Sequence, residues 1–594
     1  MPERASPVAD VGVTETGDSL LIAPRNPAEV VRLRTLLEHA LPGVRLVRHS
    51  QGFAIDGWQS VVLSRMPPEA GLVWRPDARR FLENRQRLTS SHKSFRRQVA
   101  EIKAKGPNYA KQLISDLDGL DALDSHQVVN VAAMTAQDGF GLCVFDEQGA
   151  GKTVTFIFAF DLLVQRDLAD VTLVVAPKSM IPEWPRDLAR FKGDLYKVGL
   201  LAGSRREKLR VLASGPDFLV TNFETAVSME GELRAYLRGY GDRAVLAVDE
   251  SFFIKNPDAQ RTAALRRLRE WCGRAYVLCG TPAPNSPHDL VEQFNFVDLG
   301  LTFAGVNVPD DRVEARPVVQ TAIEERGVFV RHLKRDVLPE LPGKTFHRIL
   351  VPLSPLQEKI YRSVLSGLVD DLKKTDDLSF LKHIGSFLAK RSALLQICSN
   401  PTNFVDGYRE TPCKLTTLDD LLQRLIGGQQ EKVVIWSFYT ASLEAILARY
   451  SRFCPVRYDG KITDVGERRL AVERFQDDDT TMLFVANPAA AGAGLTLHRA
   501  KYAVYESVSN QAAHYLQSLD RIHRRGQGRA VEYFVLLANR TLEITEFDRL
   551  TEKERAAQLL FGDTVDLPVT RESMLREAKA LLAEMETPAR VPKN

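Results

Sequence analysis

Two parts of the chain alternate short apolar segments with longer amphipathic stretches. The first part, roughly residues 142–300, contains the apolar segments LCVF, TLVVA, DFLVT, AVLAVDE and AYVLCG. The second part contains KVVIWS, TMLFVAN, KYAVYE and VEYFVLLAN. Strands that are apolar along their whole length and separated by helices are typical of parallel sheets covered on both faces. The pattern therefore predicts an α/β protein with two lobes.

The segments around these lobes have a different pattern. Residues 355–400 are mostly helical in pattern, with the strand-like TFHRILVPL (345–353) in front of them. Near the amino terminus we expect a helix over 28–41 and strands over 44–55 and 58–65, and then a basic helix over 90–105. This organisation predicts five regions: a small accessory α/β domain (1–118), a first lobe (119–300), a linker with helical protrusions (301–410), a second lobe (411–560), and a C-terminal helix and tail (561–594).

Length and composition exclude several classes of protein. A chain of 594 residues is too long for one hydrophobic core, so we expect two or three domains. No apolar run approaches the roughly 20 residues of a membrane span, and the first residues lack the apolar core of a signal peptide. The six cysteines form no C-x-x-C pair, and the net charge is only +3. We therefore expect a cytoplasmic protein without a disulfide framework or zinc site.

The segment FDEQGAGKT (145–153) is close to a phosphate-binding loop, although Asp146 replaces the usual first glycine. Gly149 and Gly151 leave room for backbone N–H groups to curl around phosphate oxygens at the start of a helix. Lys152 is expected to reach the β- and γ-phosphates of a nucleotide, and Thr153 to hold Mg²⁺. An apolar strand precedes the segment and a helical stretch follows it, which is the context that such a loop requires.

Two acids end the apolar segment LAVDES (246–251). The end of a buried strand suits a magnesium site, and Asp249 is expected to hold Mg²⁺ directly or through water. Glu250 is expected to orient and deprotonate the water that attacks the nucleotide.

The segment YLQSLDRIHRRGQ (515–527) predicts a helix in the second lobe. Gln517, Asp520, Arg521 and Arg524 recur at spacings of three and four residues, which places them on one face of that helix. An arginine that one lobe supplies to the γ-phosphate bound by another lobe accelerates hydrolysis by about 10³–10⁵. Arg521 and Arg524 are therefore candidates for this role.

Taken in order, these motifs resemble the Swi/Snf-like branch of the superfamily-two helicases. In that branch the phosphate loop has the sequence D-E-x-G-x-G-K-T, so Asp146 matches the family's own variant. The resemblance spans roughly residues 120–550 and also includes VVAPKSMIPEW, VTNFE, DESFFIKN, LCGTPAPN, VRHLKRDVLPELPGK, LLQICSNP, KVVIWSFY, YDGKI and ANPAAAGAGLTL.

The resemblance implies two RecA-like lobes, ATP and Mg²⁺ as cofactors, and roles for particular residues. By similarity, Gln127 binds adenine, Gly494 belongs to a loop that closes the nucleotide cleft, and Arg521 and Arg524 are the finger arginines. The residues that by similarity lie along a nucleic-acid track are Lys178, Trp184, Thr221, Asn222, Ser437 and Thr496.

Two departures mark the chain as a divergent member, of the kind found in bacteria and phages. The acid motif continues with Ser251 and Phe252, where the family usually has Ala-His. Since that histidine typically couples the nucleotide state to the DNA side, Phe252 leaves the coupling route open. The segment YESVSNQAAHYLQ lacks the family's usual aspartate, for which Glu506 is the candidate substitute.

The sequence thus favours an ATP-dependent translocase on double-stranded DNA, located in the cytoplasm with the nucleoid. A strand-separating DNA or RNA helicase is one alternative, although Gly-Thr-Pro in the third motif argues against the RNA branch. A nucleotide-gated module that recruits a partner protein is another. The accessory domain at 1–118 offers a place for a protein partner.

Overall fold

The computed structural model describes most of the chain, in two compact units. The described residues are 8–14, 19–41, 44, 46–56, 60, 63, 66, 70–283, 286–405, 407–462, 464–490, 495–507, 512–557 and 570–586. The first unit contains the described residues up to Val337, and the second contains those from Leu338 to Ala556 together with 570–586. This division falls inside 301–410, the region that the sequence pattern assigns to a linker.

The described part of the first unit contains a seven-stranded sheet in which all paired strands are parallel. In sheet order the strands are β12 (Phe329–Val330), β6 (Gly141–Val144), β11 (Arg274–Leu278), β10 (Ala244–Asp249), β7 (Val171–Val175), β9 (Phe218–Thr221) and β8 (Val198–Leu200). Because parallel strands end at the same edge, the loops that follow β6, β7, β9 and β10 line one edge of this sheet.

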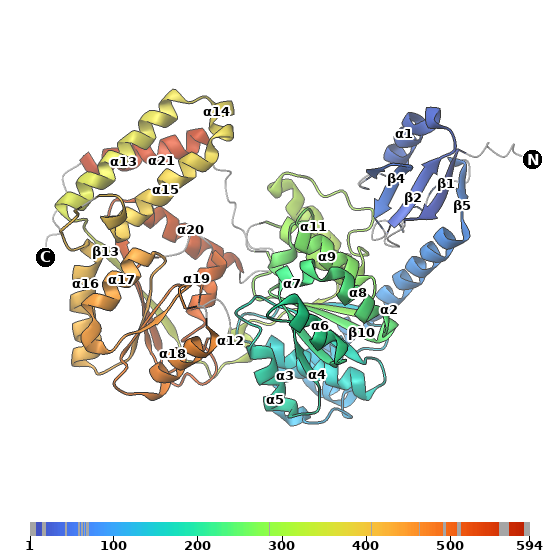
Figure 1. The fold of residues 1–594 in the computed structure, drawn as a ribbon, viewed down its shortest axis with the longest axis horizontal. Coiled ribbons are helices and arrows are strands. Elements are labelled where there is room, and N and C mark those ends of the chain that lie inside the picture. Colours follow the sequence, from blue (N-terminus) through green and yellow to red (C-terminus); the bar gives the residue numbers. More distant parts are fainter. Residues whose placement is uncertain are drawn as a thin grey trace, which may run out of the picture. The chain divides into compact units, whose positions relative to one another are not determined.

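Helices cover both faces of the sheet, as Figure 1 shows in green and cyan. Successive strand residues point to opposite faces, so Val174 packs in one core and Leu173 and Val175 pack in the other. The helices α3, α4 and α5 contribute to the first core, and α7 to α11 to the second. The helices are α3 (Ser125–Met134), α4 (Lys152–Gln165), α5 (Glu183–Lys192), α6 (Arg205–Ala213), α7 (Phe223–Ser228), α8 (Glu230–Arg238), α9 (Gln260–Arg269), α10 (His288–Asp298), α11 (Arg312–Arg326) and α12 (Lys334–Val337).

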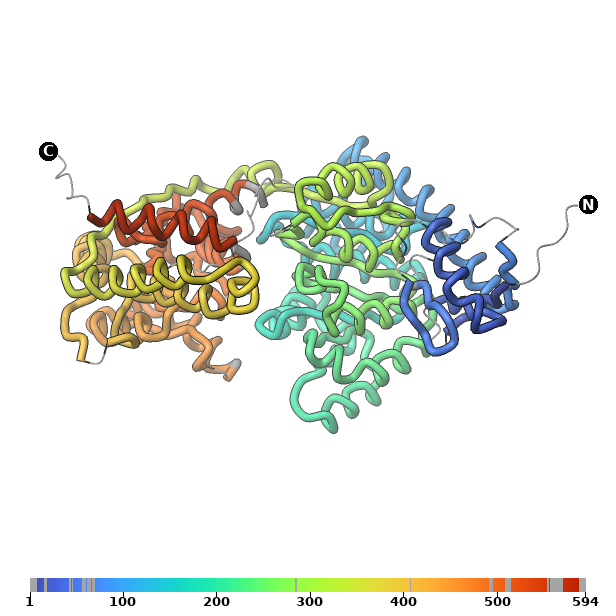
Figure 2. The backbone as a smooth tube through the Cα atoms, turned by 90° about the horizontal axis from the view of Figure 1, so that it is seen from above, coloured from blue at the N-terminus to red at the C-terminus, as the bar shows by residue number. Residues whose placement is uncertain are grey.

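The accessory domain is a small sheet with its own core, joined to the lobe by a long helix. Its described strands run in the order β3 (Leu46–His49), β4 (Gly52–Asp56), β2 (Ser19–Pro24), β1 (Ala9–Val13) and β5 (Leu72–Trp74), and α1 (Val30–Ala40) packs on them. The helix α2 (Pro76–Leu113), which breaks at Gly106, connects this sheet to the lobe (Figures 1 and 2). The strand expected over 44–55 is a hairpin, β3 and β4. Most of 58–65 lies outside the described residues, and Ser60 and Leu63 within it are not in a strand.

In the part that the structure describes, the second unit is built on a six-stranded parallel sheet. In sheet order its strands are β13 (Lys344–Val351), β18 (Val531–Ala538), β17 (Tyr502–Tyr505), β14 (Val433–Trp436), β16 (Leu483–Ala486) and β15 (Val456–Tyr458). Every apolar segment named from the sequence in either lobe is therefore a strand, and the prediction of two parallel α/β lobes is confirmed.

Four of the second unit's helices form a bundle with a separate core. Tyr361, Phe380, Leu394 and Leu581 bring α13, α14, α15 and α21 together, and Figures 1 and 2 show these helices side by side. The helices of this unit are α13 (Pro355–Lys374), α14 (Asp377–Lys382), α15 (Ile384–Ser399), α16 (Cys413–Leu422), α17 (Thr440–Arg449), α18 (Val465–Asp477), α19 (Ala512–Leu519), α20 (Leu542–Ala557) and α21 (Arg571–Glu586). The expected tail, 587–594, lies outside the described residues. Of the helices described, none combines the length and the apolarity that crossing a membrane requires.

A buried ion pair ties the bundle side of this unit to its sheet. Lys414 on α16 is fully buried and donates to a carboxylate oxygen of Glu543 and to the backbone oxygen of Glu506 (2.6 Å). Burial opposes the charge of Lys414, but Glu543 and Glu506 outweigh it and raise the pKa of the lysine. Two buried charges can be tolerated only while each remains paired, so the fold of the second unit depends on this contact.

Replacing Lys414 with methionine should lower the free energy of unfolding of the second unit by about 3–5 kcal/mol, because the carboxylate of Glu543 then stays buried without its partner. Urea unfolding followed by circular dichroism measures this loss. Lys461→Met, which removes the exposed pair with Glu444, is the control and should leave the transition unchanged. Equal unfolding curves for the two variants would show that the buried pair contributes nothing to stability.

Candidate active site

The phosphate loop, residues 146–153, connects β6 to α4 and has the backbone shape that its glycines allow. Gly149 and Gly151 have φ angles of 81° and 86°, in the left-handed region that side chains disfavour. A Cβ atom on Gly151 would lie 2.4 Å from Nε2 of Gln127. Lys152 begins α4, and its Nζ donates to the backbone oxygens of Asp146 (2.9 Å) and Glu147 (3.3 Å). The loop therefore curls around the lysine ammonium at a helix N-terminus.

Asp146, the residue that replaces the usual glycine, anchors the loop. Its side chain is fully buried, and Oδ2 accepts a hydrogen bond from Nδ2 of Asn130 (2.6 Å). Its other oxygen, Oδ1, lies 2.9 Å from Nδ1 of His332. Asn130 lies on α3 and His332 lies after β12, so one carboxylate joins the loop to two segments that are far apart in the sequence.

The two acids lie at the end of β10, next to the loop. Asp249 and Glu250 are almost fully buried, and Oε1 of Glu250 accepts a hydrogen bond from Nε2 of Gln148 (2.9 Å). Oδ1 of Asp249 accepts from the backbone N–H of Glu250 (2.9 Å). Glu250 has a φ of 51°, a strained backbone position for a residue other than glycine. Both acids therefore lie beside the phosphate loop, and their roles in hydrolysis stay predictions.

Burial raises the pKa of Asp249 to about 7, and repulsion from Glu250 adds to the shift. Lys152 and two hydrogen bonds oppose it, one from the backbone N–H of Glu250 and one from Trp184. The nearby carboxylate of Glu250 disfavours the charge of Asp249, and a bound cation would offset that repulsion. The acid pair is thus suited to hold a metal ion.

The residues present fit ATP with Mg²⁺. The described residues contain no group of three or more His, Cys, Asp or Glu side chains that could hold a metal ion. Mg²⁺ is usually bound by one or two carboxylates together with phosphate oxygens, which Asp249 and the phosphate loop can provide. Thr153, predicted as a magnesium ligand, follows Lys152 on α4 and is half-buried.

Two further predicted nucleotide contacts have different outcomes. Gln127 is buried against the loop, where its Nε2 donates to the backbone oxygen of Gly151 (3.2 Å) and its Oε1 accepts from the N–H of Asp124 (2.9 Å). It therefore lies at the nucleotide site, and its contact with adenine stays a prediction. Gly494, predicted to help close the cleft, lies outside the described residues.

The prediction of a helix over 515–527 is wrong for its second half. The helix α19 ends at Leu519, and the residues from 520 to 526 form turns and bends. Arg521 and Arg524 are nevertheless neighbours, because each donates from NH1 to the backbone oxygen of Leu495, at 3.4 and 3.3 Å. Arg524 also donates to Oγ1 of Thr496 (2.7 Å). A shared carbonyl, rather than a helix face, brings the two arginines together.

Three of the predicted nucleic-acid contacts are available on the surface. Lys178 follows β7 with 71% of its side chain exposed, near Glu224 (3.9 Å). Asn222 follows β9, where its side chain caps α7 by accepting from the N–H of Thr225 (2.8 Å). Thr496 in the second unit is half-buried beside Arg524.

The other three do not fit the predicted track, because their side chains are fully buried. Ser437 donates to Oε2 of Glu506 (2.7 Å), and Ser399 donates to Oε1 of the same carboxylate, so these residues connect the end of β14 to α15. Thr221 ends β9 inside the core. Trp184 packs edge-on against Phe156 with ring centroids 5.7 Å apart. Direct contact with a nucleic acid would require each side chain to leave the core.

Trp184 instead contacts the acid pair. Its Nε1 donates to Oδ2 of Asp249 (3.2 Å), and this hydrogen bond favours the ionised carboxylate. Trp184 therefore positions Asp249 from α5. At the position of the family's usual histidine, Phe252 stacks on Phe253 with ring centroids 4.6 Å apart, so no titratable group stands there.

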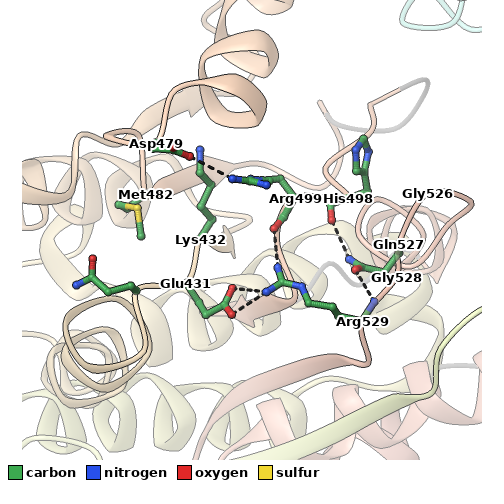
Figure 3. A pocket seen from close by; sticks show the side chains of 11 residues that line it. Glu431, Lys432, Asp479, Met482, His498, Arg499, Gly526, Gln527, Gly528 and Arg529 are labelled. Carbon is green, nitrogen blue, oxygen red and sulfur yellow. Dashed lines mark hydrogen bonds and ion pairs between the residues drawn. The ribbon is translucent and has the colours of Figure 1, made fainter.

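A separate pocket of about 520 Å³ lies at the other edge of the second unit's sheet, where β14 and β16 begin. Two ion pairs lie in its lining, as Figure 3 shows, Arg529 with Glu431 (2.7 Å) and Arg499 with Asp479 (3.2 Å), and Lys432 donates to the backbone oxygens of Phe475 and Asp478. Because these charges are already paired, the pocket presents no group of catalytic residues like the one at β6 and β10.

Comparison with known proteins agrees with this geometry. A model of the SNF2-related domain matches residues 124–403, and a model of the helicase conserved C-terminal domain matches residues 413–526. Together they cover about two thirds of the chain. The chain belongs to the SNF2 family of superfamily-two helicases. It therefore carries the ATPase domain and the helicase C-terminal domain of that family.

The SNF2-family relatives are distant and longer than this chain. The chain is 27% identical over 474 residues to the ISWI chromatin-remodeling complex ATPase ISW1 of Saccharomyces cerevisiae, covering 74% of this chain and 40% of the relative. It is 28% identical over 438 residues to YwqA of Bacillus subtilis, covering 68% and 45%. A solved SWI2/SNF2 ATPase core of Sulfolobus solfataricus in complex with dsDNA is 20% identical, with a TM-score of 0.35 and coverage of 77% and 96%. The chain thus spans less than half the length of these two relatives.

The raised pKa of Asp249 predicts that, without a nucleotide, this carboxyl lowers the free energy of unfolding at pH values above about 7. A carboxyl whose folded pKa is raised stabilises the fold at low pH, and this contribution is lost as the pH rises through about 7. Asp249→Asn should therefore raise the melting temperature by a few degrees at pH 8, since 1 kcal/mol shifts a domain of 150–250 residues by about 2–4 °C.

Melting curves at pH 5 and pH 8, without nucleotide or metal, measure this effect. The gain should be smaller at pH 5 than at pH 8, because folded Asp249 is then protonated and the remaining cost is only that of keeping a proton that the unfolded carboxyl has released. Asp258→Asn, at an exposed position after the same strand, is the control and should show no gain at either pH. A lower melting temperature for Asp249→Asn at both pH values would contradict the assigned cost.

Proposed function

We propose that this protein hydrolyses ATP with Mg²⁺ and uses the cycle to move along double-stranded DNA. The observation that carries the proposal is the buried group of Lys152, Asp249 and Glu250 at one edge of a parallel sheet. A second parallel sheet on the same chain carries Arg521 and Arg524 on a shared carbonyl. Two such lobes are the arrangement in which closure and opening convert hydrolysis into movement.

Each residue has a defined role in hydrolysis. ATP, bound with Mg²⁺, supplies the phosphoryl group that water attacks. Lys152 stabilises negative charge on the phosphates, and Asp249 holds the metal ion. Glu250 accepts the proton of the attacking water, while Gln148 orients its carboxylate. Arg521 and Arg524 stabilise the charge that develops in the transition state, which requires the two lobes to close.

The proposed track is the phosphate backbone of duplex DNA. Lys178 and Asn222 follow neighbouring strands at the same sheet edge as the ATP site. Ammonium, amide and hydroxyl groups can grip phosphates without reading the base sequence. The yeast relative is named as the ATPase of a chromatin-remodeling complex, which supports DNA as the substrate.

Duplex DNA should raise the rate of ATP hydrolysis severalfold or more, and its affinity should fall steeply with salt, because the contacts are to phosphates. Phosphate release at several salt concentrations measures both effects. Lys152→Ala is the control and should show no turnover with any nucleic acid. Equal stimulation by single-stranded RNA would favour an RNA helicase. The absence of stimulation by any nucleic acid would favour a nucleotide-gated module.

Arg524→Ala should cut turnover by about 10² or more while ATP affinity stays within a few fold, if the guanidinium acts only in the closed transition state. Its hydrogen bonds to Leu495 and Thr496 lie at a partly exposed position, so their loss should change the melting temperature little. Turnover and melting temperature are measured on one preparation, with the exposed neighbour Arg525→Ala as control. A destabilised variant that keeps full turnover per folded molecule would make Arg524 a structural residue.

A further inference from the structure

The chain that follows β12 runs directly beside the phosphate loop. Because β12 pairs in parallel with β6, both strands end at the same edge of the sheet. The backbone contacts continue past the strands: Phe145 N–H donates to Val330 O (2.9 Å), and Glu147 N–H donates to His332 O (2.9 Å). Residues 330–334 therefore form a second wall of the loop, from a part of the chain that lies about 185 residues away.

Side chains fix this wall in place. NH1 of Arg331 donates to the backbone oxygen of Phe145 (3.1 Å). The N–H of Lys334 donates to Oε2 of Glu147 (2.8 Å), so the carboxylate of Glu147 caps the start of α12. With the contact between His332 and Asp146, the last residue before the loop and the first two residues of the loop hold three residues of the wall. The backbone position of Lys334 relative to the loop is thus determined by contacts from both sides.

The side chain of Lys334 reaches the turn of the phosphate loop. A Cβ atom built on Gly149 would lie 2.9 Å from Cε and 3.0 Å from Nζ of Lys334. Only 4% of this lysine is exposed, so its ammonium is held inside the structure and not in bulk water. Its ammonium therefore lies at the loop on the side of Gly149, whereas that of Lys152 lies at the carbonyls of Asp146 and Glu147.

We propose that Lys334 is a second phosphate-binding lysine, which contacts the β- or γ-phosphate of ATP alongside Lys152. The proposal rests on the proposed function, because it requires ATP at the loop. The electrostatics of the site support it. Four carboxylates lie within or beside the loop: Asp146, Glu147, Asp249 and Glu250. Arg331 offsets part of this charge at Asp146 and Glu147, but four carboxylates still repel a polyphosphate, and the ammonium groups of Lys152 and Lys334 together reduce that repulsion.

The test measures nucleotide binding without turnover. Displacement of a fluorescent ATP analogue gives the Kd of ATP and of AMP for the whole chain. Lys334→Met keeps the length of the side chain and removes its charge, and it should weaken ATP binding about tenfold or more, the effect of one lost charge-assisted contact. AMP, which lacks the β- and γ-phosphates, should bind as before. Lys334→Arg should recover part of the ATP affinity, and Arg335→Ala, the exposed neighbour, should change neither Kd.

The results separate this proposal from its alternatives. If Lys334→Met binds ATP as tightly as the natural chain while Lys152→Ala does not, Lys334 only balances the nearby carboxylates and the proposal is wrong. If Lys334→Met lowers the melting temperature but its folded fraction binds ATP with an unchanged Kd, the proposal is likewise wrong. Lys334→Arg repeats the measurement in a variant that keeps the positive charge. If the natural chain itself binds no ATP, the proposed function fails rather than the assignment of Lys334.

Discussion

A carboxylate that is buried completely needs hydrogen-bond partners, and Asp146 finds them on two segments that are distant in the sequence. Asn130 holds it from α3 and His332 holds it from the chain after β12. The first contact keeps α3 against the loop, where Gln127 lies on Gly151. The second keeps the wall of residues 330–334 in place and with it Lys334 on Gly149. The shape of the nucleotide site thus follows from one acid at a position where phosphate loops usually have glycine.

In the second unit, too, a buried acid at the sheet edge joins segments that are distant in the sequence. Glu506, at the end of β17, accepts hydrogen bonds from Ser437 at the end of β14 and from Ser399 on the bundle. Lys414 adds a buried ion pair beneath them. At the corresponding edge of the first unit, Asp249 lowers the stability of the fold, because burial and Glu250 disfavour its ionised form. Catalytic sites commonly accept such a loss of stability, and a cation at the site would relieve it.

The sequence predicted the parts of the molecule with strong local patterns. Long apolar segments identified the central strands, and the glycines and Lys152 identified the loop. Three short edge strands, β8, β12 and β15, have too few residues for a pattern, and β12 brings His332 and Lys334 to the loop. Helical spacing placed Arg521 and Arg524 on a helix that in fact ends at Leu519, because polar residues at such spacings occur equally well in turns. Burial of Trp184 against Asp249 depends on packing across elements, which no local pattern records.

The central proposal is that nucleotide hydrolysis at the first lobe drives movement along intact duplex DNA. Displacement of a labelled third strand from a DNA triplex tests it most directly, since a motor that passes along the duplex must remove that strand. The account predicts that displacement requires ATP, that it increases with the length of duplex from which the motor approaches, and that it stops in Glu250→Gln. ATP hydrolysis stimulated by duplex DNA without displacement of the third strand would contradict it.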